Sequence, residues 1–214
     1  MKKLLVDIAY PFLENAARAE LIAAGTLHQY KKGEMLVCAE KPINKVFFIL
    51  NGFVKVCKEN ADGSQFVLFY LHAGHSFGIS LSFEDDRHKH LSIASFMATE
   101  PANVLEVSFQ DKDRLAKKYD SMYRYVLRTA VMHYGFYMSL INSIAFGQLD
   151  VRIEYFLSRL SKAKNKTVLK INHQEIADGL NASRESVSRL LKKMEEAGKI
   201  KLGRNQIEII NLAI

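Results

Sequence analysis

The sequence predicts an α+β protein with three parts in order: an antiparallel β barrel or sandwich, a long helix, and a winged helix-turn-helix. Short apolar or alternating segments separated by glycine turns fill residues 26–109, which is typical of antiparallel strands. From about residue 111 the apolar residues follow a helical period. Residues 171–200 then contain two helix-start patterns, and a basic hairpin follows them. We place the domain boundaries at 1–110, 111–147 and 148–214.

The first part combines a helical start with a series of short strands. Residues up to about 25 carry apolar side chains at helical spacing. The strands that we expect after them are Met35–Val37, Val46–Leu50, Phe53–Cys57, Phe66–Leu71, Ser92–Ala98 and Val104–Ser108. The turns that separate them carry Gly33, Gly52, Gly63, Gly74 and Gly78.

The long helix carries two apolar stripes side by side. The first alternates three- and four-residue steps, as the a and d positions of a coiled coil do, through Tyr123, Val126, Ala130, His133, Tyr137, Leu140 and Ile144. The second runs through Leu127, Val131, Tyr134, Met138, Ile141 and Ala145. One stripe can pack on the barrel while the other meets a partner. We assign the first stripe to the seam of a homodimer, and Gly147–Asp150 interrupts the helix before another at Val151–Leu160.

Residues 171–180 have the pattern of the first helix of a helix-turn-helix. Asn172 is a helix cap and Glu175 stands three residues later, as in a capping box. Ala177 is small enough for another helix to cross closely. Asn181 follows where the turn requires a left-handed residue, a conformation that asparagine tolerates.

A second helix and a wing follow. Ser183 caps the helix and Gly198 ends it, while Val187, Leu190, Leu191 and Met194 form its apolar side. The segments Ile200–Leu202 and Ile207–Ile210 form a two-stranded wing that turns at Gly203, with Arg204 at its tip.

The exposed side of the second helix carries groups that suit the major groove of DNA. Arg184 and Arg189 can each bond the O6 and N7 atoms of guanine, and Glu185 can accept from the N4 amino group of cytosine. The other cations of this helix and of the wing, and the hydroxyl at the helix cap, suit DNA phosphates. Contacts with phosphates fix the register of the protein on DNA and do not read the base sequence. The phosphate contacts that we expect are Ser183, Lys192, Lys193, Lys199, Lys201 and Arg204.

Charge and composition narrow the class of protein. The formal charge is +7, and residues 162–204 hold eleven basic against five acidic residues, so the basic excess is local. Double-stranded DNA is the partner that this pattern favours. The two cysteines have no metal-ligand spacing, no apolar run is long enough to span a membrane, and no nucleophile–base pair or phosphate loop is present. We therefore expect a cytoplasmic protein that is not an enzyme.

The whole chain resembles the Crp/Fnr family of bacterial transcription regulators. The resemblance rests on the phrases KKGEMLV, FFILNGFVKV and AGHSFG, on the long helix, and above all on SRESVSR. It implies a β-roll of the cupin-like jelly-roll type that senses a small effector, a dimerisation helix and a DNA-binding winged helix. It also implies a homodimer on an inverted repeat, with RNA polymerase as a further candidate partner. The base-reading positions that it implies are Arg184, Glu185, Ser188 and Arg189.

The effector is where the sequence departs from the family pattern. Ile79 follows Phe77-Gly78, where binders of cyclic AMP carry a glutamate, and the adjacent Arg-Ser pair that holds the cyclic phosphate is missing. The N-terminal cysteine cluster of the iron–sulfur sensors is also missing. Both ligands are therefore disfavoured. We expect an organic effector near His72, His75, Tyr134 and Met138.

Three alternatives stay open. A haem-based gas sensor of the same fold would use His75 or His72 as the axial ligand. Cys57 lies between Lys55 and Lys58 and could sense redox state, although we favour a buried structural thiol. From a different class, the chain could be a small-molecule-binding module whose basic C-terminal part binds protein or membrane.

Overall fold

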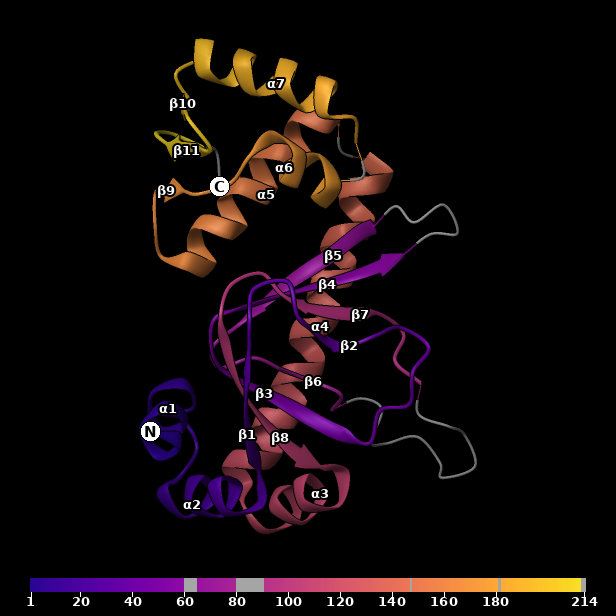
Figure 1. The fold of residues 1–214 in the computed structure, drawn as a ribbon, viewed down its shortest axis with the longest axis vertical. Helices are drawn as coiled ribbons and strands as arrows, with labels where there is room; N and C mark the ends of the chain where they lie inside the picture. The colour runs from indigo at the N-terminus through magenta and orange to yellow at the C-terminus, as the bar shows by residue number, and fades with distance from the viewer. Residues whose placement is uncertain (60–64, 80–90, 147, 181, 213–214) are drawn as a thin grey trace. The chain divides into compact units, whose positions relative to one another are not determined.

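The computed structural model describes residues 1–59, 65–79, 91–146, 148–180 and 182–212, without the side chains of 142–146 and 163. The chain divides into two compact units (Figure 1). The first comprises residues 1–58 and 69–136, and the second comprises residues 59–68 and 137–214. Each unit is described by itself, and helix α4 (Asp120–Phe146) contributes residues to both.

The first unit is a β structure of two four-stranded sheets with helices beside it. One sheet has the strand order β1-β8-β3-β6 and the other β2-β7-β4-β5. Its elements are α1 (Lys2–Ala9), α2 (Asn15–Ala24), β1 (Thr26–Tyr30), β2 (Met35–Val37), β3 (Lys45–Asn51), β4 (Phe53–Glu59), β5 (Gln65–His72), β6 (Ser76–Phe77), β7 (Ser95–Ala98), β8 (Ala102–Ser108) and α3 (Phe109–Lys118). The predicted strands are present. The structure adds β1 and β6, and it shortens the strand expected at Ser92–Ala98 to its last four residues.

Glycine turns join these strands as the sequence predicts. Gly33, Gly52, Gly74 and Gly78 all have positive φ, whereas Gly63 lies outside the described residues. Gly52 shows why no other residue fits. Its φ is +81°, and a Cβ atom there would lie 2.6 Å from the carbonyl oxygen of Pro101.

The core of the first unit packs the N-terminal helices and α4 against the sheets. Tyr10, immediately after α1, is completely buried, and its hydroxyl donates to the carbonyl oxygen of His75 at 2.6 Å. The hydroxyl of Tyr125 on α4 donates to Ser76 Oγ at 2.8 Å. The predicted long helical region is two helices, because α3 ends before Tyr119 and α4 begins at Asp120.

The second unit is a winged helix-turn-helix. Its elements are α5 (Leu149–Lys164), β9 (Val168–Leu169), α6 (His173–Leu180), α7 (Arg184–Glu196), β10 (Ile200–Gly203) and β11 (Gln206–Ile209). β10 and β11 form the predicted hairpin, and β9 pairs with the far side of β11. Apolar residues of all three helices and the hairpin form one core.

Two local details of the second unit differ from the sequence prediction. α5 extends to Lys164 and closes on Asn165, which has φ +49°, so it is longer than the helix expected at Val151–Leu160. Gly179, for which the sequence predicts no role, lets α6 pack closely on α5. A Cβ atom at Gly179 would lie 2.8 Å from the ring of Phe156 on α5. α4 ends at Phe146 and α5 begins at Leu149, while Gly147 between them lies outside the described residues. Among the described residues no helix is both long and apolar enough to cross a membrane.

Candidate functional site

Two helix caps fix the starts of α6 and α7, and both confirm the sequence prediction. Asn172 Oδ1 accepts from the backbone N–H of Glu175 at 2.9 Å, and Glu175 Oε2 accepts from the N–H of Asn172 at 2.8 Å. This is the reciprocal capping box. Ser183 Oγ accepts from the N–H of Ser186 at 3.1 Å. The predicted turn residue Asn181 lies outside the described residues.

α7 separates an apolar side from an exposed charged side. Val187, Leu191 and Met194 are buried in the core of the second unit. The side chains of Arg184, Glu185, Arg189 and Lys192 are exposed on the rest of the helix surface. Spacings of three and four residues place Glu185, Arg189 and Lys192 on one side of the helix. The structure therefore presents two forked cations and one carboxylate to solvent along one helix.

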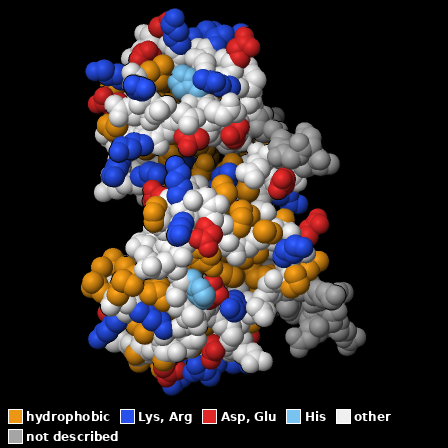
Figure 2. Space-filling model, in the orientation of Figure 1, with side chains coloured by type: hydrophobic (Ala, Val, Ile, Leu, Met, Phe, Trp, Pro, Cys, Tyr) orange, Lys and Arg blue, Asp and Glu red, His pale blue; other side chains and the backbone are white. Residues whose placement is uncertain are grey.

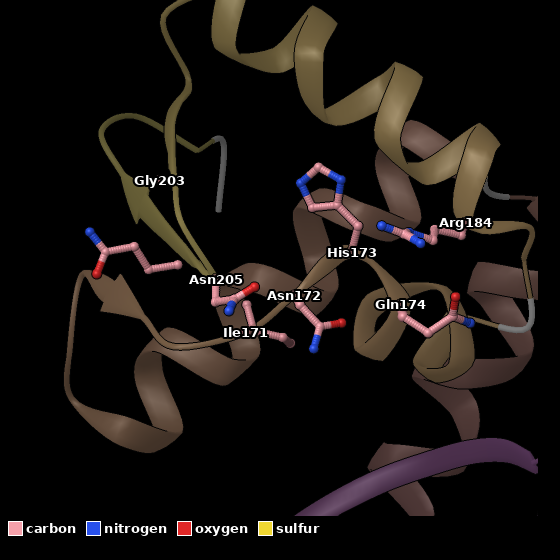
Figure 3. Close-up of a pocket in the computed structure, with 8 residues that line it drawn as sticks. Ile171, Asn172, His173, Gln174, Arg184, Gly203 and Asn205 are labelled. Carbon is pink, nitrogen blue, oxygen red and sulfur yellow. The ribbon is translucent and has the colours of Figure 1, made fainter.

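Ser188 is the exception among the predicted base-reading residues. It is only half-exposed, and its Oγ lies 2.8 Å from Nδ1 of His173, the first residue of α6. In Figure 3 the His173 side chain rises from the start of α6 toward α7, and the Arg184 side chain extends toward it from the start of α7. The contact joins residues 15 positions apart, so no local pattern in the sequence could have indicated it.

A groove of about 370 Å³ lies beside this contact. The starts of α6 and α7 and the turn between β10 and β11 line it, and Figure 3 shows their side chains. The lining residues are Ile171, Asn172, His173, Gln174, Arg184, Gly203, Asn205 and Gln206. Asn205 has φ +55°, a left-handed conformation that lets the hairpin turn tightly at Arg204. Most of these groups are polar, so the groove suits a polar ligand such as a sugar–phosphate backbone.

Most of the predicted phosphate contacts are exposed, with one correction. Ser183, Lys192, Lys193, Lys201 and Arg204 are exposed, and Figure 2 shows Lys and Arg side chains over the visible face of the second unit. Lys199 is different, because its ammonium group forms an ion pair with Glu154 of α5, which is only 17% exposed. Lys199 is therefore held on its own unit, and it is less suited to a phosphate than the other lysines.

The stripe of α4 that was assigned to the partner seam is only partly exposed. Val126, assigned to the partner seam, is 3% exposed in the core of the first unit, and the His133 ring stacks on Phe69 of β5 at 5.8 Å. Tyr137 and Leu140 are half-buried, Tyr123 and Ala130 are exposed, and the side chain of Ile144 is not described. The second stripe is the exposed one, and its described members are Leu127, Val131, Tyr134, Met138 and Ile141. The residue pattern could not show which stripe is buried, because both have the same helical spacing and both are largely apolar.

A second cavity, of about 320 Å³, lies in the first unit. His72 and His75 line it as expected, with ring centroids 3.9 Å apart. Tyr134 does not line it and is 65% exposed, and Met138 belongs to the second unit. The other lining residues are Ile8, Ala9, Pro11, Phe12, Ala73, Gly74, Tyr125, Arg128, Thr129 and Met132. Of the four residues predicted near the effector, His72 and His75 line this cavity, whereas Tyr134 and Met138 are not among its lining residues.

The chemistry of this cavity is mixed. Phe12 stacks on Tyr125 with a centroid distance of 5.3 Å, and the Arg128 guanidinium lies 5.7 Å from the centre of the Phe12 ring. Burial raises the pKa of Tyr125 to about 12, so its hydroxyl stays protonated. The cavity thus offers an aromatic wall, a guanidinium group and two imidazoles.

Three further sequence expectations concern ligands of the first unit. Ile79 is 2% exposed and packs in the core. An apolar side chain therefore fills the position at which binders of cyclic AMP carry a glutamate. Cys57 is buried and its Sγ lies 3.8 Å from the carbonyl oxygen of Ser95, as the structural-thiol alternative requires. Among the described residues no cluster of three or more His, Cys, Asp or Glu side chains could hold a metal ion.

Comparison with protein families identifies both units. Residues 27–119 match the cyclic nucleotide-binding domain, and residues 151–213 match the Crp-like helix-turn-helix domain. The two matches follow each other without overlap and together span most of the chain.

Individual relatives match most of the length of this chain. The cAMP-activated global transcriptional regulator Vfr of Pseudomonas aeruginosa is 27% identical over 188 residues, which cover 85% of this chain and 87% of Vfr. The cAMP-activated regulator CRP of Pasteurella multocida is 25% identical, over 79% of this chain and 83% of CRP. Among solved structures, the c-di-GMP-responsive global regulator CLP of Xanthomonas campestris has a TM-score of 0.80 at 17% identity, and the match covers 92% of this chain and 100% of CLP.

Proposed function

The chain belongs to the Crp/Fnr family of effector-responsive, DNA-binding transcription regulators, and from that premise we propose that it acts as a dimer on an inverted-repeat site. The observation that carries the proposal is the exposed side of α7. It presents Arg184, Glu185 and Arg189 to solvent, beside a basic wing. The regulators of this family are not enzymes.

The division of labour on DNA follows from side-chain chemistry. Arg184 and Arg189 each offer a planar fork of donors, which matches the two acceptors on the major-groove edge of guanine. Glu185 accepts from the amino group of cytosine. Lys192, Lys193, Lys201 and Arg204, with the Ser183 hydroxyl, hold phosphates and thereby set the register of α7 in the groove.

The exposed stripe of α4 supports the dimer. Leu127, Val131 and Tyr134 are 50%, 70% and 65% exposed, although they are large and apolar. Exposed apolar side chains in a row along a helix are typical of a surface that a partner covers. A second copy of this chain would bury the stripe symmetrically. Two winged helices placed by such a dimer would read half-sites about 34 Å apart on one side of the duplex.

The test is selection of random duplex DNA by the purified protein at physiological salt. We expect an enriched two-fold inverted repeat, and we expect Arg189→Ala to abolish the enrichment. A repeat selected only after a small-molecule extract of cells is added would mean that the effector is obligatory. The proposal fails if no motif is enriched under either condition, or if binding is salt-dependent and indifferent to sequence.

We place the effector in the cavity lined by His72, His75 and Arg128. Its volume is within the range of small-molecule sites, at the lower end. Aromatic rings, a guanidinium group and imidazoles suit a small organic molecule with an anionic or polar group. Cyclic AMP activates the relatives from Pseudomonas and Pasteurella. We do not assign it here, because the hydrocarbon side chain of Ile79 cannot form the hydrogen bond that a glutamate would form with a ribose.

A substitution that fills the cavity tests this assignment. Met132→Trp places a larger side chain among the lining residues. It should remove the effect of the cell extract on DNA affinity and leave affinity without extract unchanged. An undiminished response to the extract would move the effector to another site.

A haem-based sensor is the second candidate, favoured by the two histidines that line one cavity. Purified protein with haem added should then show a visible absorption spectrum shifted from that of free haem, and a variant with both His75→Ala and His72→Ala should give the spectrum of free haem. A wild-type spectrum identical to that of free haem would dismiss this candidate.

A further inference from the structure

The hydroxyl of Ser188 is by itself a poor reader of DNA sequence. A serine hydroxyl has one hydrogen to donate and two lone pairs to accept with, and it rotates to suit its partner. It therefore bonds donors and acceptors on base edges alike. For Ser188 to distinguish bases, another group must fix the direction of its hydrogen.

His173 is placed to do this. Its Nδ1 lies 2.8 Å from Ser188 Oγ, which is the ordinary length of a hydrogen bond to a hydroxyl. Both residues are half-buried, and the capping box at Asn172 and Glu175 fixes the backbone from which the imidazole extends. Figure 3 shows the ring directed at α7 rather than out into solvent along α6. The contact therefore joins the capped start of α6 to the second turn of α7.

We propose that His173 is a specificity-determining positioning residue, which makes Ser188 an acceptor toward the major groove. With the imidazole proton on Nε2, Nδ1 accepts the Ser188 hydrogen, and only lone pairs of Oγ remain for a base. An acceptor bonds the amino groups at adenine N6 or cytosine N4. It does not bond guanine O6 or thymine O4, which are themselves acceptors. The base pair opposite Ser188 is thus read through a histidine on the neighbouring helix.

The inference rests on the proposed function, and the experiment separates the two. Wild-type protein first selects its DNA site, and affinities are then measured for all four bases at each position of the half-site. Ser188→Ala identifies the pair read through Ser188 as the one whose preference it removes. We expect wild type to favour one orientation of one base pair there by about three- to tenfold, the range of one hydrogen bond, because each pair places its amino group at a different point across the groove.

His173→Ala should flatten the preference at that same pair to within about twofold and leave the pair read by Arg189 unchanged. The double variant with Ser188→Ala should add nothing to Ser188→Ala alone. His173→Asn, whose amide oxygen can take the place of Nδ1, should keep most of the preference. Gln174→Ala is the matched control, because Gln174 lines the same groove and bonds Asp178 instead of Ser188.

Several results would overturn the inference while the proposed function stands. These are an unchanged preference in His173→Ala, a uniform loss of affinity for every sequence in that variant, or no pair affected by Ser188→Ala. Failure of the wild type to select any site would instead overturn the proposed function, and the inference with it, before any variant is compared. Thermal unfolding of each variant shows whether the second unit stays folded.

Discussion

The burial of His133 makes a clear prediction for stability. Its ring stacks on Phe69, and its Nε2 is buried without a hydrogen-bond partner among the described residues. Burial lowers the pKa of His133, and a hydrogen bond with the backbone of Ser76 opposes this only in part. The folded protein therefore resists protonation of this imidazole.

The sign of the pH effect follows from linkage. In the unfolded chain the histidine has a pKa of about 6.5, above its value in the folded protein. Its contribution to stability is therefore complete above about pH 6.5 and is lost as the pH falls toward the folded pKa. We expect His133→Phe to lose less thermal stability than wild type between pH 7.5 and pH 5.5. Equal losses, measured by circular dichroism melts in matched buffers, would contradict this assignment.

Single residues also show what sequence reasoning can reach. The caps at Asn172 and Ser183 were predictable because donor and acceptor lie three residues apart. The His173–Ser188 contact and the Lys199–Glu154 ion pair were not predictable, because each joins two segments whose packing the sequence pattern does not specify. Local chemistry was thus predictable, and contacts made by tertiary packing were not.

At the scale of elements, α4 makes the sharpest prediction. Its exposed apolar stripe faces away from the buried residues Met122, Tyr125 and Val126, as a helical period requires. We expect wild type to sediment with twice the 24.3 kDa of one chain. Val131→Glu should weaken this dimer by at least about tenfold, because pairing would bury two unpaired carboxylates close together.

The control for this prediction is Ile93→Glu, which adds the same charge at an apolar side chain of similar exposure, 61% against 70%. It should leave the mass unchanged. A monomeric wild type, or a Val131→Glu variant that dimerises as well as wild type, would place the partner surface elsewhere.

The helix also shows the limit of pattern reasoning for an element. The two stripes have the same heptad spacing, so the sequence pattern alone does not show which of them packs on the rest of the chain. What decides between them is where β5 and the N-terminal segment lie. Phe69 packs on His133, and Tyr10 packs on Tyr125 with ring centroids 5.5 Å apart. Those contacts depend on strands paired across the whole first unit, such as β1 with β8 between Thr26 and Glu106.

At the scale of the whole molecule, the fold class could be predicted because each part has its own periodicity. Strand turns with glycine, a heptad helix and paired helix caps are each local signals. The pairing order of the strands could not be predicted, and neither could the set of residues that lines the cavity at His72 and His75. Both depend on segments far apart in sequence. His72 and His75 share a cavity because they flank one turn, whereas Phe12 and Arg128 reach it from other elements.

The most direct measurement compares Arg189→Ala with Lys192→Ala on the selected inverted repeat and on a scrambled duplex. Arg189 should read a base and Lys192 a phosphate. We therefore predict that Arg189→Ala lowers affinity for the repeat by about ten- to a hundredfold and leaves the scrambled duplex nearly unchanged. Lys192→Ala should weaken both duplexes alike and make the salt dependence shallower. If Arg189→Ala weakened both duplexes equally, α7 would not be reading DNA sequence.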